Sequence, residues 1–250
     1  MNDTIDPIRK AQAAMQQPRP KRFYENAAVE AREGAFAVVL DGRPARTPAK
    51  KLLAVPTRAL AQALADEWQA QEAVLDPRAM PLTRIVNSGL DGVVGNEAAV
   101  IDDMTRYAGS DLVCYRAGEP EGLVAAQGAA WDPILAWARE DLGARFVLGE
   151  GVMHVTQPDA AIAAVRARLE THPPLALAGL HVMTTLTGSV LLALATAAGR
   201  IGVDDAWAAA HVDERHQERL WGEDEEALQR RGQREAEFRA AAQVVALASA

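Results

Sequence analysis

The stretch PPLALAGLHVMTTLTGSVLLALATAAG, residues 173–199, contains no Asp, Glu, Lys or Arg. A run of this length reaches the length of a membrane-spanning helix. One histidine, four threonines and a serine dilute its apolar character, aromatic belts are absent from its ends, and no second span exists to pair with it. We therefore expect no membrane insertion. A helix that is apolar all round is typical of the centre of a helical bundle, so the stretch predicts one central buried helix.

The segments on both sides of this stretch have the spacing of amphipathic helices. Thr57 is a suitable N-cap for the first of them, and Asp76-Pro77 is expected to end it. Short strands at 145–148 and 152–155 are expected to pair as a hairpin. The predicted helices cover residues 57–75, 82–90, 96–108, 121–142, 158–170, 203–221 and 224–247.

The N-terminal part of the chain has a β pattern instead. Hydrophobic alternation over residues 35–40, followed by Asp41-Gly42 and then residues 43–47, predicts a hairpin, because a type I′ turn needs positive φ at both central residues. Three or four short strands are expected between residues 22 and 55. The fold class is therefore α+β, a small N-terminal β-rich module followed by a larger, mainly α-helical domain. Its parts are a mobile arm (1–20), the β-rich module with its connecting helix (21–78) and the helical domain (79–250).

Charge and cysteine usage exclude several classes of protein. The 250 residues include 26 Lys and Arg against 34 Asp and Glu, a net charge of −8, which argues against a nucleic-acid partner. The bases are concentrated in residues 1–60, which hold 11 of them against 6 acids. The single cysteine, Cys114, excludes an internal disulfide and a Cys-based zinc site, and its apolar neighbours predict a protonated, buried thiol. The N-terminus resembles neither a signal nor a transit peptide, so we expect a bacterial cytoplasmic protein.

The common catalytic motifs are absent. The sequence contains no GxxxxGK[ST], GxGxxG, HExxH or GxSxG string. Of the five histidines, only His211 and His216 are close in sequence, and on a helix five residues turn their side chains about 140° apart, which is poor geometry for one metal ion. We therefore expect no metal and no cofactor.

Acidic residues crowd around Trp221. Because Glu214, Glu218 and Trp221 have i, i+4, i+7 spacing, they are expected to share one helix face. Three interpretations stay open: a protein-docking surface with an aromatic anchor, a solvated face of ordinary ion pairs with Trp221 turned into the core, and a carboxylate pair acting as acid and base. The candidate partner-binding residues are Glu214, Asp213, Glu218, Trp221 and Asp224.

Eight blocks along the chain occur in the order found in one known family. They are RFY (22–24), LDGRPARTPAKKLL (40–53), ALADEWQAQ (63–71), MPLTRIVNSGLDGV (80–93), RYAGSDLVCYRA (106–117), WDP (131–133), LTGS (186–189) and WG (221–222). In these blocks the chain resembles the assembly chaperones of mitochondrial-type ATP synthase that bind the α subunit of the catalytic head.

The resemblance implies a non-enzymatic chaperone, with bacterial members in the cytoplasm and eukaryotic members in the mitochondrial matrix. Such a protein, expected here to be a monomer, would keep free α subunit soluble until the β subunit pairs with it. We hypothesise that Glu214, assisted by Asp213, Glu218 and Asp224, pairs with basic residues of the α subunit. Two alternatives remain: a small-molecule enzyme that uses the Asp, Glu and His residues of 204–226, and a scaffold module that joins other proteins.

Overall fold

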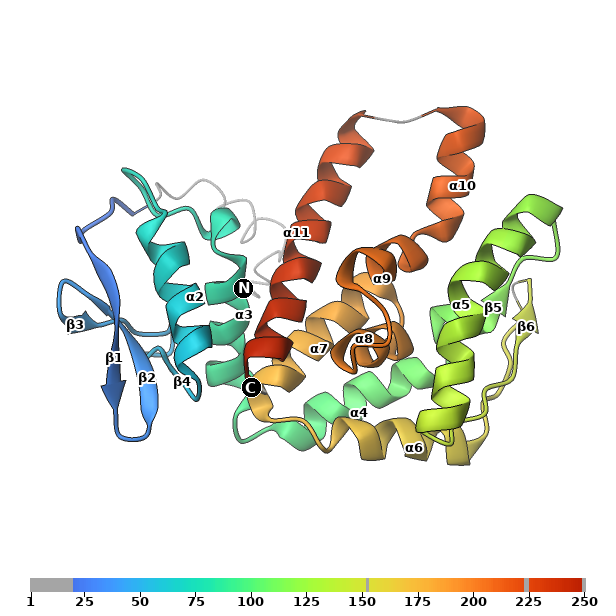
Figure 1. Cartoon of the computed structure of the whole chain (residues 1–250), viewed down its shortest axis with the longest axis horizontal. Coiled ribbons are helices and arrows are strands. Elements are labelled where there is room, and N and C mark those ends of the chain that lie inside the picture. Colours follow the sequence, from blue (N-terminus) through green and yellow to red (C-terminus); the bar gives the residue numbers. More distant parts are fainter. Residues whose placement is uncertain (1–19, 152, 223–224, 249–250) are drawn as a thin grey trace, which may run out of the picture.

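The computed structural model describes residues 20–151, 153–222 and 225–248 (Figure 1). The predicted N-terminal arm lies outside this range except for Pro20. Figure 1 shows a small sheet at one end of the molecule, with helices filling the rest.

The sheet is built around one central strand. β2 pairs antiparallel with β1, β3 and β4. The predicted hairpin is confirmed: Asp41 and Gly42 have φ of 47° and 77°, as a type I′ turn requires, and Leu40 pairs with Arg43 across it. The strands are β1 (Ala27–Arg32), β2 (Ala35–Leu40), β3 (Arg43–Pro44) and β4 (Ala54–Val55).

Helix α2 (Arg58–Gln69) packs on β1 and β2 through Leu60 and Leu64, which are fully buried. Thr57 is its N-cap, as predicted, and accepts a hydrogen bond from the Leu60 amide at 3.2 Å. The Thr57 hydroxyl also donates to the Leu247 carbonyl at 2.6 Å, which ties the start of α2 to the C-terminal helix. The helix ends at Gln69, earlier than predicted.

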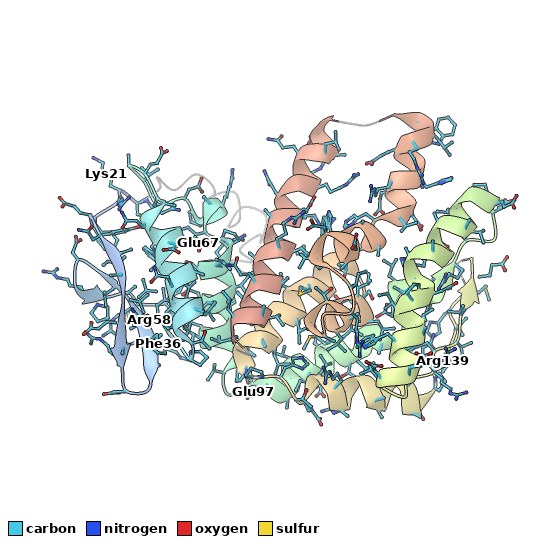
Figure 2. The ribbon with its side chains drawn as sticks, viewed as in Figure 1. Lys21, Phe36, Arg58, Glu67, Glu97 and Arg139 are labelled. Carbon is cyan, nitrogen blue, oxygen red and sulfur yellow. The ribbon has the colours of Figure 1, made fainter. Side chains whose placement is uncertain are left out.

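Helix α3 (Pro81–Ser88) begins against a side chain of α2. Met80, its N-cap residue, makes no side-chain capping bond. Glu67, labelled in Figure 2, accepts hydrogen bonds from the Leu82 and Thr83 amides at 2.9 and 2.7 Å. Burial raises the pKa of Glu67, against the lowering effect of these bonds. A carboxylate from one helix thus supplies the N-terminal cap of the next.

The remaining helices surround a buried core. The described part of the chain also has three short turns of other helix types, η1 (Pro77–Ala79), η2 (Gly89–Val93) and η3 (Leu112–Cys114). The helices are α4 (Glu97–Ala108), α5 (Glu121–Asp141), α6 (Asp159–Leu169), α7 (Pro174–Thr187), α8 (Val190–Ala197), α9 (Val203–Ala210), α10 (Val212–Trp221) and α11 (Glu225–Ala248).

The uncharged stretch lies at the centre of the core, as predicted, but it forms two helices. α7 ends at Gly188, which adopts a left-handed φ of 69°, and α8 begins with Ser189 as its N-cap, whose hydroxyl accepts from the Leu192 amide at 3.0 Å. The prediction of one helix over 173–199 is wrong because composition measures only how apolar a segment is. It does not show where a glycine and a capping serine end one helix and begin another.

Helix α11 packs along α7 at close range. A Cβ on Gly179 of α7 would lie 2.7 Å from both the Ala241 carbonyl oxygen and Val245 Cγ2 of α11. Glycine at this position lets the two backbones approach closely. Phe238 and Val245 of α11 are buried in the same core, as predicted for its inner face.

The hairpin predicted over residues 145–155 is wrong. The described residues of these two segments form no strand there. Instead β6 (Gly149–Glu150) pairs in parallel with β5 (Tyr115–Arg116). The side chain of Gln157, which is buried, binds both the amide and the carbonyl of Val147 at 2.8 Å. A side chain thereby satisfies the backbone groups that a partner strand would have satisfied.

The observed architecture is α+β, as predicted, with a small N-terminal sheet and a mainly helical remainder. The domain boundary near residue 78 stays a prediction, since α3 packs on both α2 and α11. None of the helices in the described residues is both long enough and apolar enough to cross a bilayer.

Candidate functional site

The predicted helix over residues 203–221 is broken at His211. α9 ends at Ala210 and α10 begins at Val212, and in Figure 1 α10 turns up beside α5. The buried His211 ring lies 4.0 Å from the Trp207 ring, centroid to centroid, and its Nδ1 donates to the Trp207 carbonyl at 2.8 Å. Burial lowers the pKa of His211. The break gives α10 its own direction, so α10 stands out from the core.

Glu218 joins α10 to α11 through a two-point ion pair with Arg231. One guanidinium nitrogen of Arg231, Nη1, lies 2.9 Å from Oε2 of Glu218, and Nη2 contacts Oε1. The two side chains are only 19% and 21% exposed. This fork-to-fork geometry is the strong form of an Arg–carboxylate contact. Glu218 is therefore engaged within the protein.

Asp213 joins α10 to α5. Its Oδ1 accepts a hydrogen bond at 2.7 Å from Nε2 of Gln127, a buried residue of α5. The other end of the same amide, Oε1 of Gln127, accepts from the Ala117 amide at 2.8 Å. Asp213 thus takes part in a chain of bonds that positions the start of α10.

The end of α10 is exposed and apolar. Trp221 is 86% exposed and Leu220 is 62% exposed. The interpretation in which Trp221 turns into the core is therefore wrong. Glu214 is also exposed, on the first turns of the same helix. The predicted residue Asp224 lies outside the described residues.

The four predicted residues that the structure describes thus divide into two groups. Glu214 and Trp221 face solvent, whereas Asp213 and Glu218 bind other parts of the chain. The exposed Leu220 was missed, because helical spacing alone does not show which side of an isolated, mainly polar helix remains uncovered.

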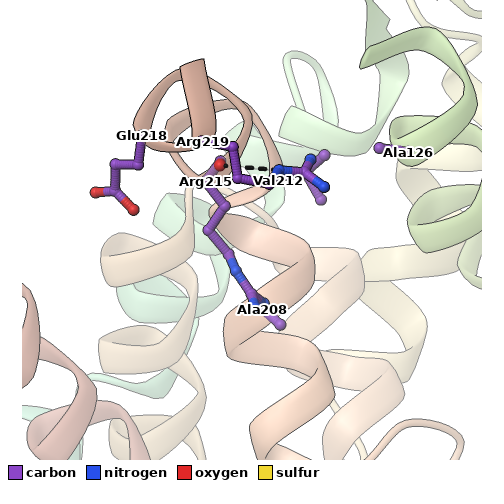
Figure 3. Close-up of a pocket in the computed structure, with 6 residues that line it drawn as sticks. All are labelled: Ala126, Ala208, Val212, Arg215, Glu218 and Arg219. Atoms are coloured by element: carbon purple, nitrogen blue, oxygen red, sulfur yellow. Dashed lines mark hydrogen bonds between the residues drawn. The ribbon is translucent and has the colours of Figure 1, made fainter. Parts of the chain in front are cut away.

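A pocket of about 400 Å³ lies along α10, where α5 and α9 face it (Figure 3). Two arginines of α10 line it, and Nε of Arg219 donates to the carbonyl of Arg215 at 3.3 Å. The lining residues are Ala126, Ala208, Val212, Arg215, Glu218 and Arg219. Half of this lining consists of small or branched apolar side chains. Its carboxylate, Glu218, is already paired with Arg231.

The Asp, Glu and His residues of 204–226 do not converge on one point within the described part of this segment. Asp204 pairs with Arg239, Glu218 pairs with Arg231, and His211 is bound to the backbone of α9. Among the residues that the structure describes, no group of three His, Cys, Asp or Glu side chains is placed to hold a metal ion.

Cys114 is buried, as predicted. Burial, together with the nearby Asp111 charge, raises the pKa of its thiol to about 12. A thiol with this pKa stays protonated near neutral pH and packs as a small hydrophobic group.

Comparison with known proteins identifies the family. Residues 21–139 match the model of the ATP12 chaperone protein family. The crystal structure of Atp12 from Paracoccus denitrificans is 41% identical, covers 92% of this chain and 98% of its own, and superposes with a TM-score of 0.86. The chain belongs to the ATP12 chaperone family. The family match ends at residue 139, whereas the structural match to Atp12 extends over nearly the whole fold.

Two further relatives are similar to this chain over most of its length, one of them described as a putative chaperone. The Atu1473 protein from Agrobacterium tumefaciens is 53% identical, with a TM-score of 0.89 over 97% of this chain and 91% of that one. The mitochondrial protein atp12 of Schizosaccharomyces pombe is 24% identical over 237 residues, which are 87% of this chain and 79% of that protein. The family resemblance drawn from the eight sequence blocks is confirmed.

Proposed function

We propose that this protein is an assembly chaperone of ATP synthase that binds the free α subunit and prevents its aggregation until the β subunit pairs with it. Its membership in a chaperone family supports this role. The observation that carries the proposal is the exposed apolar end of α10, where Leu220 and Trp221 together face solvent. Exposed apolar residues of this size commonly mark protein-binding surfaces.

A chaperone of this kind has to cover an apolar surface and later release it. An unassembled subunit exposes the surface that it will bury against its neighbours, and such obligate interfaces are rich in apolar residues. In our proposal Trp221 is the aromatic anchor of the contact. Glu214 lies on the same helix and supplies a charge that orients the α subunit through a basic residue of its surface.

The other two described acids have a positioning role in this proposal. Asp213 binds Gln127 of α5, and Glu218 binds Arg231 of α11, so that both ends of α10 are attached to neighbouring helices. Because α10 is attached in this way, Glu214 and Trp221 are already held in place before the partner binds. Ordering a loose segment on binding would reduce affinity. Asp224 remains a candidate contact by sequence alone.

We also propose that the protein has no catalytic activity and works as a monomer in the bacterial cytoplasm. Asp204 pairs with Arg239, Glu218 pairs with Arg231 and Asp213 binds Gln127, so these three acids are engaged with different partners, which favours a binding role over acid–base chemistry. The two relatives of highest identity reported above come from bacteria. Sedimentation of the purified chain tests the monomer, and cell fractionation tests the location.

The main experiment measures light scattering of α subunit diluted from denaturant, with and without the full-length protein. Wild type is expected to suppress scattering. Glu214→Lys and Trp221→Ser are expected to weaken suppression by at least about tenfold in the required concentration, as for residues at the centre of an interface. Glu72→Lys makes the same charge reversal, and Met153→Ser replaces another exposed apolar side chain with serine; both changes lie elsewhere on the surface, and both variants should act as wild type.

Three outcomes would contradict the proposal. Unchanged suppression by both α10 variants would remove the proposed contact. No suppression by wild type would remove the chaperone role. Stable binding of α subunit without any effect on its aggregation would favour the scaffold alternative. Thermal unfolding of each variant shows that its fold is intact, which is expected because both substituted side chains are exposed.

A further inference from the structure

A second, separate groove lies on the other side of α11, where η1 and α3 meet it. Its volume is about 680 Å³. Four arginines line it, Arg78 and Arg84 from the η1–α3 side and Arg230 and Arg234 from α11, together with one acid, Glu237. All four arginines are exposed. The groove is therefore basic, although the chain as a whole has a net charge of −8.

Internal ion pairs neutralise only part of this charge. Arg84 lies 3.3 Å from Glu237, and Arg230 lies 2.7 Å from Glu226 of its own helix. Arg234 donates to a neutral group, the Leu186 carbonyl, at 2.8 Å. Among the described residues, Arg78 and Arg234 have no carboxylate partner within ion-pair distance. Within the part of the chain that the structure describes, two guanidinium charges at the groove are thus not neutralised by a carboxylate.

The floor of the groove contains a glycine that the fold does not need. Gly232 is in the middle of α11 with no positive φ, and a Cβ built on it would meet nothing within 4 Å. Glycine within a helix lowers its stability relative to alanine. The absence of a side chain at Gly232 relieves no contact within the described protein. It leaves room for the main chain of a partner to approach the helix closely.

Two amide side chains flank this glycine. Gln229 and Gln233 line the same groove. A glutamine side chain offers both a donor and an acceptor, which match the N–H and C=O groups of an extended main chain. Flanking arginines with amides and a glycine between them suit a polypeptide that carries carboxylates. A bare phosphate ion does not require the amides or the opening at Gly232, and the net charge of −8 disfavours a nucleic acid.

We propose that this groove binds an acidic segment of a partner polypeptide in extended conformation. Arg78 and Arg234 pair with its carboxylates, and its main chain crosses α11 at Gly232. The site is distinct from Glu214 and Trp221 on α10, and it does not depend on which subunit those residues bind. Failure of one proposal therefore leaves the other untouched.

The test uses full-length protein and a fluorescein-labelled peptide of alternating Glu and Gly, followed by fluorescence anisotropy at low ionic strength. Wild type is expected to bind the peptide, and added salt is expected to weaken binding. The paired substitution Arg78→Glu and Arg234→Glu should weaken binding by at least about tenfold, the effect of losing charged contacts at a binding site. Arg139→Glu reverses an exposed charge on α5 and should leave binding unchanged.

Gly232→Ala is the second variant. It places a methyl group at the proposed crossing point, so it should weaken binding while the protein becomes more resistant to thermal unfolding. Weaker binding in a more stable protein cannot result from damage to the fold, so this result would show that Gly232 acts in binding. It also keeps the proposal testable if the double arginine variant fails to fold.

Several results would overturn the proposal. They are no binding of the Glu–Gly peptide, equal loss of binding in Arg139→Glu, equal binding of a Gln–Gly peptide, and full affinity in Gly232→Ala. Displacement of the peptide by inorganic phosphate at an equal concentration of charge would show an anion site instead. Tighter binding of single-stranded RNA would show a nucleic-acid site.

Discussion

Asp111 caps helix α8 from a position 80 residues earlier in the chain: its Oδ2 accepts a hydrogen bond from the Leu191 amide at 3.0 Å. Its other oxygen accepts from the Val113 amide at 3.2 Å and so begins the η3 turn. Asp111 is fully buried. One side chain therefore holds the start of α8 and the η3 turn together at the place where the uncharged stretch is broken into two helices.

The first prediction concerns the pH dependence that this buried carboxyl confers. Burial raises the pKa of Asp111 from 3.8 to about 6, against the hydrogen bonds that lower it. A carboxyl whose pKa is raised on folding contributes stability below its unfolded pKa, and this contribution is lost as the pH rises through the folded value. The free energy of unfolding of wild type, minus that of Asp111→Asn, should therefore fall by about 2 kcal/mol between pH about 4 and pH about 7.

Urea unfolding of both proteins across this pH range measures the difference. Glu72→Gln, an exposed substitution, serves as the control for general effects of pH. If the difference in free energy of unfolding between wild type and Asp111→Asn stays constant with pH, folding does not change the pKa of Asp111.

The second prediction concerns the attachment of α10. Glu218→Ala leaves Arg231 partly buried without its partner, which costs more than the loss of an exposed ion pair. Amide hydrogen exchange within Val212–Trp221 should become about tenfold faster, which corresponds to about 1.4 kcal/mol of local stability. Hydrogen exchange followed by mass spectrometry resolves this helix. Arg139→Ala, which removes an exposed pair on α5, should leave α10 protected.

The charge-reversed pair Glu218→Arg with Arg231→Glu provides the decisive comparison. It should restore part of the protection, since the two side chains can pair again with opposite signs. If Glu218→Ala exchanges like wild type, the ion pair does not hold α10 in place.

The third prediction compares two helix glycines. Gly179→Ala forces a methyl group against the backbone of α11, and overpacking of this kind should lower the free energy of unfolding by about 1–3 kcal/mol. Gly128→Ala is the matched control in α5, because a Cβ there makes only an ordinary contact of 3.5 Å with Asp132. It should raise stability by about 0.5–1 kcal/mol. Equal effects of the two substitutions in urea unfolding would contradict the close packing of α7 and α11.

The fourth prediction separates the exposed tryptophan from a core tryptophan. Trp221→Ala should change the free energy of unfolding by less than about 0.5 kcal/mol, because the ring is almost fully exposed. Trp131→Ala should cost about 3–5 kcal/mol, since Trp131 is 1% exposed and its Nε1 donates to the Ala209 carbonyl at 2.8 Å. Urea unfolding of both variants tests this. A large cost for Trp221→Ala would show that this residue is part of the core.

Local patterns were enough to predict most helices and strands. Asp41-Gly42 identified a turn, Thr57 identified a helix start, and the spacing of apolar residues identified α4, α5, α6 and α11 within a few residues. Each of these signals depends on neighbours within about one or two turns of the chain. These local signals predict the structure correctly because the tertiary packing favours the same helices and turns.

The errors share a different cause. The start of α8 that follows the break at Gly188 is bound by Asp111 from 80 residues away, and the side chain of Gln157 binds the backbone of Val147 where a strand partner was expected. In the candidate site, the sequence placed Glu218 on a binding face, but Arg231 engages it from the next helix. A side-chain hydrogen bond to a distant residue leaves no periodic pattern, so these features could not be deduced from spacing.

The amino-acid sequence by itself determined the α+β class, the buried position of the uncharged stretch, the protonated state of Cys114 and, through its eight ordered blocks, the chaperone family. These follow from composition and from turn and core positions, which restrict residue type locally. Only the tertiary structure decided where the helices at Gly188 and His211 break, and which acids of α10 remain exposed. Those outcomes depend on which partner lies within hydrogen-bond distance of each polar group in the folded chain, and most of these partners are far apart in sequence.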